Sequence, residues 1–291
     1  MKKKTKNTTC TNKDRVFCYF HCDDLDGFSS ASVVQKEYPD ADFYGYNYER
    51  HYPIVSGYDK VFMVDCSIPA KDMAKLKIHN KEFIWIDHHE RTTKEIEKHL
   101  HNIKGLRDSK HSACVLTWKY VYGDLPVPVI LKSIEDFDIW KWKIPYTDEI
   151  NTALFIDYKS REKLIPLLKY HSFESIKHII DLGKTYINMR DSQVNFLKSL
   201  MRVKDFHGHN TAFINTPMHG SQLGSKILMD NPDIEVVFMW YNFRDIIRVS
   251  LRSRSIDVSE LASKYGGGGH RLASGFSVNA NDTKLRNVFL W

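Results

Sequence analysis

Three apolar segments in the first third of this chain each end abruptly in carboxylate and imidazole side chains. They are residues 15–20, followed by His21, Asp24 and Asp26; residues 60–64, followed by Asp65; and residues 82–86, followed by Asp87, His88 and His89. β-Branched and aromatic residues are frequent in each segment, which indicates buried β-strands. The carboxyl ends of parallel strands lie along one edge of a sheet, where ligands bind in α/β proteins. We therefore expect the three polar groups to meet in one cleft.

Helical patterns alternate with these strands, for example over residues 28–38, 71–77 and 112–122. Such alternation predicts a doubly wound parallel sheet. The pattern is mostly helical from about 161 to 202, and strand and helix patterns alternate again from about 206. The predicted fold is α/β, with a loose basic tail at 1–14, a doubly wound parallel sheet domain at 15–160, a helical connector at 161–205 and a smaller α/β domain with a mixed sheet at 206–291.

Bulk properties exclude several classes of protein. The chain of 291 residues is long enough for two domains, and no apolar stretch is long enough to span a bilayer. The Lys-rich start has no apolar core like that of a signal peptide, so we expect a soluble, cytoplasmic protein. Five cysteines without a Cys-x-x-Cys pair argue against a disulfide framework or structural zinc. A net charge of +6 suits an anionic ligand but is weak evidence for nucleic acid.

Converging carboxylates repel one another unless cations neutralise them. A mixture of carboxylate and imidazole ligands suits Mn²⁺ best; Fe²⁺, Co²⁺ and Zn²⁺ also fit, and Mg²⁺ fits less well because it prefers oxygen alone. Two ions roughly 3.5–4 Å apart, bridged by hydroxide, could activate water and hold the oxygens of a phosphoryl group. The pattern therefore points to hydrolysis of a phosphoester or phosphoanhydride.

Each polar group also has an ordinary structural explanation. Asp24 and Asp26 beside a glycine suit a turn, and Asp65 could cap the helix that follows it. The triplet at 87–89 is harder to explain in this way, because two adjacent imidazoles at the end of a buried strand serve no packing purpose. The occurrence of all the groups together favours a metal site.

The chain resembles the DHH phosphoesterases that carry a DHH-associated C-terminal domain. The residues that carry the resemblance are His21-x-x-Asp24-x-Asp26-Gly27, Val64-Asp65, Asp87-His88-His89, Asp136-Phe137-Asp138-Ile139-Trp140, and Gly266 to His270 with Ala273-Ser274-Gly275-Phe276. Each motif is weak alone, but the five in this order, from Val16 to about Val278, are specific. The resemblance implies a phosphoesterase with two metal ions, whose C-terminal domain holds the substrate.

The resemblance also implies roles for individual residues. The expected metal ligands are His21 and Asp24 for one ion, Asp26, His88 and Asp136 for the other, and Asp65 as the bridge. Asp138 competes with Asp136, and Asp23 is a spare ligand because the spacing of the first motif differs by one residue from its commonest nuclease form. Asp87 is expected to orient an imidazole and fix its tautomer. His89 is expected to face the scissile phosphate and stabilise its charge.

Strand alternation over 248–254 places Arg252 and Arg254 on one face, where guanidinium groups suit phosphate recognition. The glycines Gly267, Gly268 and Gly269 would let a backbone loop approach a phosphate closely, and His270 would add a donor. A solvated basic strand face and a flexible loop are the ordinary explanations. We expect these residues to bind the substrate nucleotide.

The predicted function is Mn²⁺-dependent hydrolysis of phosphodiester bonds in short RNA or DNA oligonucleotides or in linear or cyclic dinucleotides, similar to nano-RNases that also act on pAp. The sequence shows no clear aromatic stacking platform for a long strand. A polyphosphate or pyrophosphate hydrolase is an alternative, and a non-catalytic nucleotide sensor on the same fold is another. We expect no membrane partner, and the sequence leaves both a monomer and a homodimer open.

Overall fold

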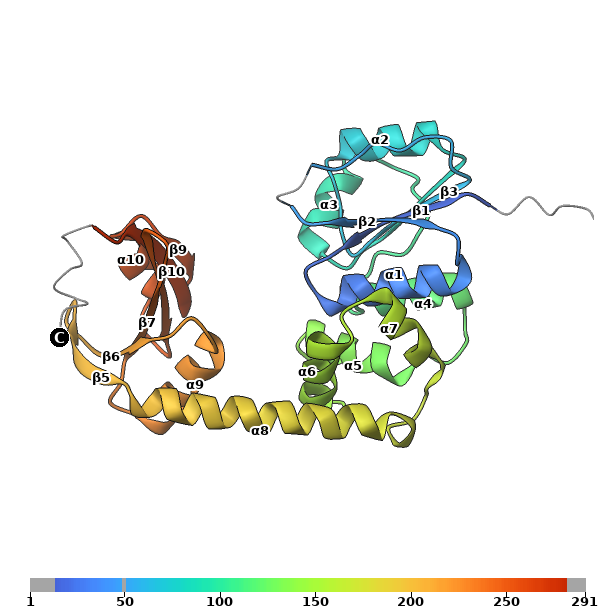
Figure 1. Ribbon diagram of the computed structural model, residues 1–291. Coiled ribbons are helices and arrows are strands. Elements are labelled where there is room, and N and C mark those ends of the chain that lie inside the picture. Colours follow the sequence, from blue (N-terminus) through green and yellow to red (C-terminus); the bar gives the residue numbers. More distant parts are fainter. Residues whose placement is uncertain (1–13, 49–50, 282–291) are drawn as a thin grey trace, which may run out of the picture. The chain divides into compact units, whose positions relative to one another are not determined.

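The computed structural model describes residues 14–48 and 51–281. The chain forms two compact units, residues 1–186 and residues 187–291, which are described separately (Figure 1). The predicted basic tail lies outside the described residues except for Asp14.

The first unit contains a four-stranded parallel sheet. Its order is β2 (Asp42–Tyr46), β1 (Val16–His21), β3 (Lys60–Val64) and β4 (Glu82–Ile86). Helices α1 (Leu25–Glu37) and α4 (Ala113–Tyr122) cover one face, and helices α2 (Ala70–His79) and α3 (Glu90–Glu97) cover the other (Figure 1). The doubly wound parallel sheet predicted from the sequence is confirmed.

Both faces of this sheet are buried. Trp85 and Met63 pack with Leu76 of α2, whereas Phe62 and Ile84 point to the opposite face. Burial on both faces explains why the strands are continuous apolar runs without alternating polar residues. As a result, charged and imidazole side chains in β1, β3 and β4 occur only at the strand ends and in the residues that follow them.

A helical region completes the first unit. It comprises α5 (Val129–Asp138), α6 (Thr147–Asp157), α7 (Arg161–Leu164), two 3₁₀ segments (Ile165–Lys169 and Glu174–Ile176) and the start of α8 (Lys177–Ser199). Leu164, Leu168 and Ile176 are buried in the same core as α5. The first part of the predicted connector therefore packs into the first unit, and the division between the units falls within α8.

The mixed sheet that the sequence predicted for the second unit is confirmed, and it has six strands. Its order is β5 (Arg202–Phe206), β6 (His209–Asn215), β7 (Val236–Phe243), β8 (Ile246–Ser253), β10 (Ala273–Asn279) and β9 (Gly268–His270). Strands β6 and β7 pair in parallel and the other neighbours pair in antiparallel fashion. Helix α9 (Gly220–Asp230) packs on the face with Val237 and Met239, and α10 (Val258–Ser263) on the face with Phe238 and Leu251.

Within the described ranges, none of the helices combines the length and the apolar character needed to cross a membrane.

Candidate metal centre

Three carboxylates surround one imidazole at the carboxyl edge of the parallel sheet. The Nε2 atom of His88 lies 3.6 Å from an oxygen of Asp26, 3.4 Å from an oxygen of Asp65 and 3.4 Å from an oxygen of Asp138. Asp26 is in the first turn of α1, Asp65 follows β3, His88 follows β4, and Asp138 ends α5. The structure thus brings residues 112 positions apart in the sequence into one cluster, as expected when strand ends share a sheet edge.

Asp65 is the most deeply buried member that lacks a hydrogen bond. Its side chain is 1% exposed, and neither carboxylate oxygen has a hydrogen-bond partner. Burial, together with the charges of Asp26 and the other nearby carboxylates, raises its pKa well above the usual value. Its backbone has a φ of 55°, in the left-handed region that non-glycine residues rarely adopt. Such unsatisfied and strained residues are typical of functional sites.

Asp26 is held by the first turn of another helix. Its two carboxylate oxygens accept hydrogen bonds from the backbone N–H groups of Ala113 and Cys114, at 2.7 and 2.8 Å. These amides form the N-terminus of α4, where unpaired N–H groups and the helix dipole favour a negative charge. The position of the Asp26 carboxylate is therefore fixed toward His88.

Asp138, not Asp136, reaches the cluster. Asp138 lies beside His88, and one of its oxygens is buried without a hydrogen-bond partner. Burial and the charge of Asp26 raise the pKa of Asp138 to about 8. The choice of Asp136 as the ligand is thus corrected in favour of the competing residue.

Asp136 has a different role, because the following loop uses its carboxylate fully. It accepts hydrogen bonds from the backbone N–H groups of Lys143 (2.8 Å) and Ile144 (3.1 Å) and from the hydroxyl of Thr147 (2.6 Å). Burial alone would raise the pKa of Asp136, but these hydrogen bonds outweigh it and the pKa is lowered. Asp136 therefore anchors the loop between α5 and α6.

Asp87 orients the histidine that follows the ligand His88. One oxygen of Asp87 accepts hydrogen bonds from the backbone N–H groups of His88 (2.7 Å) and His89 (3.1 Å), and it lies 2.7 Å from Nδ1 of His89. The hydrogen bond to Asp87 raises the pKa of His89. The imidazole of His89 is half-exposed, so it can meet a ligand from solvent. This geometry agrees with the orienting role predicted for Asp87.

His21 and Asp24 form a pair at the end of β1. Nε2 of His21 lies 3.4 Å from one oxygen of Asp24, and Nδ1 of His21 is buried without a hydrogen-bond partner. The other oxygen of Asp24 caps α1 by accepting the N–H of Gly27 at 2.9 Å. A Cβ atom at position 27 would lie 2.0 Å from the backbone oxygen of His21, so only glycine fits this turn. Asp23, the spare ligand, is exposed, which favours Asp24.

These residues fit divalent metal ions. The ligand atoms of Asp65, His88 and His89 lie within 4.8 Å of one another, and so do those of Asp26, His88 and Asp138. Buried polar atoms normally have partners, so the unpaired oxygens of Asp65 and Asp138 require another explanation. A cation would neutralise the carboxylates and supply that partner. The cluster is therefore a candidate metal centre with mixed oxygen and nitrogen ligands.

A cavity of about 340 Å³ lies beside this centre. Its lining includes Tyr48, Ser67 and Arg91. The ring of Tyr48 is 5.9 Å from the ring of His21, measured between centroids. Ser67 follows Asp65 by two residues and Arg91 follows His89 by two residues. The cavity thus offers a guanidinium and a hydroxyl group from residues close in sequence to the metal ligands, together with the carboxylate of Glu95, a combination that sequence patterns did not reveal.

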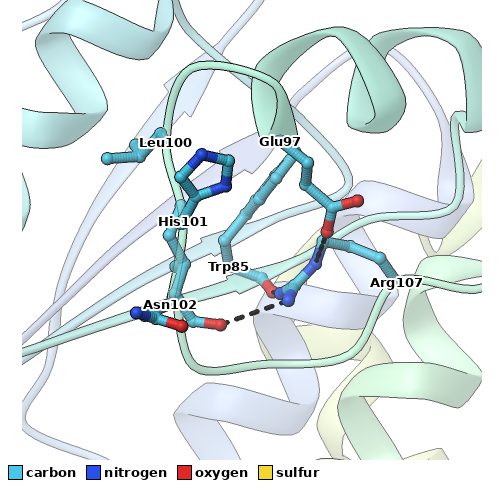
Figure 2. Close-up of a pocket in the computed structure, with 7 residues that line it drawn as sticks. Trp85, Glu97, Leu100, His101, Asn102 and Arg107 are labelled. Carbon is cyan, nitrogen blue, oxygen red and sulfur yellow. Dashed lines mark hydrogen bonds and ion pairs between the residues drawn. The ribbon is translucent and has the colours of Figure 1, made fainter.

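A larger cavity of about 480 Å³ contains none of the predicted site residues. Figure 2 shows Arg107 in this cavity between Glu97 and Trp85. The guanidinium donates to the Glu97 carboxylate at 2.8 Å and to the backbone oxygens of Trp85 and Ile103 at 2.9 and 3.1 Å. Because these bonds occupy all three nitrogens of Arg107, they serve to fix the segment after α3 to β4.

In the second unit, Arg252 and Arg254 differ in their surroundings. Arg252 is half-buried on the side of β8 that faces α9, and it donates to the hydroxyl of Ser221 at 3.3 Å. Arg254 donates from one nitrogen to the backbone oxygens of Asn231, Pro232 and Ile234, at 3.1–3.3 Å. These oxygens follow the end of α9, where carbonyl groups lack helical partners. Arg254 therefore stabilises a turn, and Arg252 is the better candidate for phosphate binding.

The glycine run is partly a strand instead of the predicted loop. Gly268, Gly269 and His270 form β9, an exposed edge strand that pairs with β10. Gly267 precedes this strand, and a Cβ atom there would lie 2.2 Å from the backbone oxygen of Gly275. Its lack of a side chain thus permits close packing of two backbone segments. The exposed N–H groups of the edge strand and the exposed His270 remain candidates for ligand contact.

Comparisons with known proteins agree with this architecture. Residues 15–137 match the model of the DHH family N-terminal domain, and residues 211–288 match that of the DHHA1 domain. Uncharacterized protein R106 of Acanthamoeba polyphaga mimivirus is 28% identical over 233 residues, which are 75% of this chain and 53% of that protein. Oligoribonuclease NrnB of Bacillus subtilis (strain 168) is 29% identical over 157 residues, which are 50% of this chain and 38% of that protein.

The matched regions thus span about half or less of these two relatives. Among solved structures, the pGpG-specific phosphodiesterase PggH of Vibrio cholerae has a TM-score of 0.55 at 15% identity, with 94% of this chain and 96% of that chain covered. This likeness concerns the fold. With both domain models matched in order and the Asp-His-His triplet at the sheet edge, the chain belongs to the DHH family and carries a DHHA1 domain.

Proposed function

We propose that this protein is a metal-dependent phosphoesterase that hydrolyses phosphodiester bonds of short oligonucleotides or dinucleotides. The observation that carries the proposal is the cluster of Asp26, Asp65, Asp138 and His88, in which both oxygens of Asp65 and one oxygen of Asp138 are buried without a hydrogen-bond partner. Two divalent ions held there, Mn²⁺ by the ligand preference, would make a water molecule nucleophilic and neutralise charge on a phosphate. We propose Asp26, His88 and Asp138 as ligands of one ion, His21 and Asp24 as ligands of the other, and Asp65 as the bridge.

Residues around the metal ligands would position the phosphate. His89 is half-exposed, and its pKa is raised through its hydrogen bond to Asp87, so it can donate a proton or a hydrogen bond to a phosphate oxygen. Arg91 in the adjacent cavity adds a positive charge near the same position. Together these groups supply the electrostatic stabilisation that phosphoryl transfer requires.

In the second unit we propose that Arg252, the exposed backbone of β9 and His270 bind the nucleotide part of the substrate. Arg252 offers a guanidinium group suited to phosphate. The edge strand presents backbone N–H groups without side chains over Gly268 and Gly269. The similarity to oligoribonuclease NrnB supports a short RNA as the substrate class.

The test is hydrolysis of a short RNA oligonucleotide with Mn²⁺ by the wild type, Asp65→Asn and His88→Ala. We expect both variants to lose at least about 100-fold in kcat/KM, because His88→Ala removes a metal ligand and Asp65→Asn removes the negative charge of another. His101→Ala is the matched control, since this exposed imidazole lies in the cavity of Figure 2 and not in the cluster. Undiminished hydrolysis by Asp65→Asn and His88→Ala would refute the proposal. Release of orthophosphate from polyphosphate without any action on RNA would favour a polyphosphate hydrolase instead.

A further inference from the structure

Three aromatic side chains form an exposed group next to the candidate metal centre. Phe137, Trp140 and Trp142 are 38%, 72% and 43% exposed. Their ring centroids lie 5.0 Å apart for Trp140 and Trp142, 5.4 Å for Phe137 and Trp142, and 6.3 Å for Phe137 and Trp140. Large aromatic side chains are costly to expose together, and such patches mark binding sites. We call these three residues the aromatic platform.

Asp136, which lies outside the metal cluster, holds in place the loop that carries Trp140 and Trp142. Trp140 and Trp142 have φ values of 59° and 51°, in the left-handed region that is unfavourable for residues with a Cβ atom. The backbone oxygen of Asp136 accepts the N–H of Lys141 at 2.9 Å, and its carboxylate accepts the N–H of Lys143 at 2.8 Å. The loop is thus constrained on both sides of Trp142, so hydrogen bonds of the folded protein hold the exposed rings of Trp140 and Trp142 in position.

The platform adjoins the site where a phosphate would be cleaved. Trp140 follows Asp138 by two residues, so their Cα atoms are at most about 7 Å apart. Lys141 and Lys143 alternate with the two tryptophans along this exposed loop; Lys141 pairs with the Glu135 carboxylate at 3.1 Å, and Lys143 adds a positive charge to the loop. Aromatic side chains interleaved with basic residues suit single-stranded nucleic acid, whose bases stack and whose phosphates are anionic.

The ring geometry leaves room for a stacked base. Trp140 and Trp142 meet edge to face, with an angle of 87° between their planes. Phe137 also meets both tryptophans edge to face, so none of the three rings stacks on another, and the 72% exposure of Trp140 leaves ring surface for a planar ligand. We propose that the aromatic platform stacks a nucleobase of the substrate, in the nucleotide next to the scissile phosphate. This inference rests on the proposed function, and it specifies a base-bearing oligonucleotide in place of inorganic polyphosphate.

The first test compares two substrates with the same phosphates, an RNA trinucleotide and its abasic analogue. We expect the wild type to prefer the base-bearing trinucleotide by about tenfold in kcat/KM. The double variant Trp140→Leu/Trp142→Leu should lose this preference, and the single variant Trp140→Leu should lose part of it. Phe196→Leu, which removes a ring that is 64% exposed on α8, should keep it. A double variant that retains the full preference would overturn the platform while leaving the phosphoesterase proposal intact.

The second test does not depend on activity. Stacking should quench the fluorescence of the exposed tryptophans when the trinucleotide is titrated into the wild type, and the abasic analogue should quench far less. Equal quenching by both ligands, or none, would overturn the inference even if hydrolysis is observed. The same holds if the double variant changes the protein from dimer to monomer in size-exclusion chromatography, because the platform would then be an interface between two copies of this chain.

Discussion

The Nε2 atom of His88 lies 3.4 Å from a carboxylate oxygen of Asp138, although 49 residues lie between these two positions in the sequence. This oxygen is buried and has no hydrogen-bond partner, whereas the carboxylate of Asp136 accepts hydrogen bonds from two backbone N–H groups and one hydroxyl. Of the two acidic residues at the end of α5, Asp138 is therefore a candidate metal ligand, and Asp136 anchors the loop that carries Trp140 and Trp142.

The different roles of Asp138 and Asp136 predict that one substitution impairs activity and the matched one impairs stability. Asp138→Asn should reduce Mn²⁺-dependent hydrolysis by at least about 100-fold with little loss of stability, because it removes a ligand and also removes a charge from a crowded cluster. Asp136→Asn should lower the free energy of unfolding by about 1–3 kcal/mol, because the amides of Lys143 and Ile144 lose a charged acceptor. Urea unfolding and kinetic assays of both variants provide the measurement. Equal loss of stability in the two variants would contradict the assignment.

Removal of metal should make the stability of the protein depend on pH. In the metal-free state the pKa of Asp138 is about 8, above the roughly 3.9 of an unfolded chain. The folded state then binds more protons than the unfolded state between these values, so the free energy of unfolding falls as pH rises from about 4 to about 8. We expect EDTA-treated protein to unfold at lower urea at about pH 8 than at about pH 5.

Binding of metal should restore the stability that the metal-free protein loses at higher pH. Saturation with Mn²⁺ at 100 times the dissociation constant should stabilise the protein by about 2.7 kcal/mol for one site. The control is Asp138→Asn in EDTA, whose unfolding should vary less with pH than that of the wild type. A metal-free wild type that becomes more stable as the pH rises over this range would show that the carboxylates do not converge as described.

Two adjacent glycines should respond differently to alanine. A Cβ atom at Gly267 would lie 2.2 Å from the backbone oxygen of Gly275, whereas one at Gly268 meets nothing within 4 Å. Gly267→Ala should therefore cost about 1–3 kcal/mol of unfolding free energy, and Gly268→Ala should change it by less than about 0.5 kcal/mol. Thermal and urea unfolding of both variants test this difference. If β9 also contacts the nucleotide, Gly268→Ala should raise KM for the oligonucleotide while leaving stability unchanged.

The two arginines of the second unit offer another matched pair. Arg252→Ala should reduce kcat/KM for an oligonucleotide by about 10- to 100-fold, through loss of a charged hydrogen bond to phosphate, and should affect a simple aryl phosphodiester much less. Arg254→Ala should mainly lower stability, by about 1 kcal/mol, because the carbonyl groups after α9 lose their donor. Equal losses on both substrates for Arg252→Ala would argue that this residue does not bind the nucleotide.

The fold class and the existence of the cluster could be predicted from the sequence. The strands of the first unit are buried on both faces, so hydrophobicity alone marks their extent and forces Asp65 and the triplet at 87–89 to the strand ends. In a parallel sheet those ends share one edge, which brings the polar groups together whatever the details of the loops. Helices α3 and α6 and strands β5, β9 and β10 were not predicted, and residues 202–205 of β5 were assigned to the helical connector, because elements with a mixed polar composition have weak patterns.

Local patterns determined which strands form and which polar residues follow them, whereas the choice between similar residues depended on tertiary contacts. Asp136 and Asp138 are two positions apart on α5, so their side chains point about 200° apart around the helix axis. Only the position of α5 against the sheet decides which of them meets His88. Arg252 and Arg254 belong to one alternating pattern, yet the end of α9 engages Arg254. Trp140 and Trp142 are exposed because Asp136 anchors the turn that carries them. Hydrogen bonds within the folded loop stabilise this turn, and the residue pattern of the sequence does not reveal them.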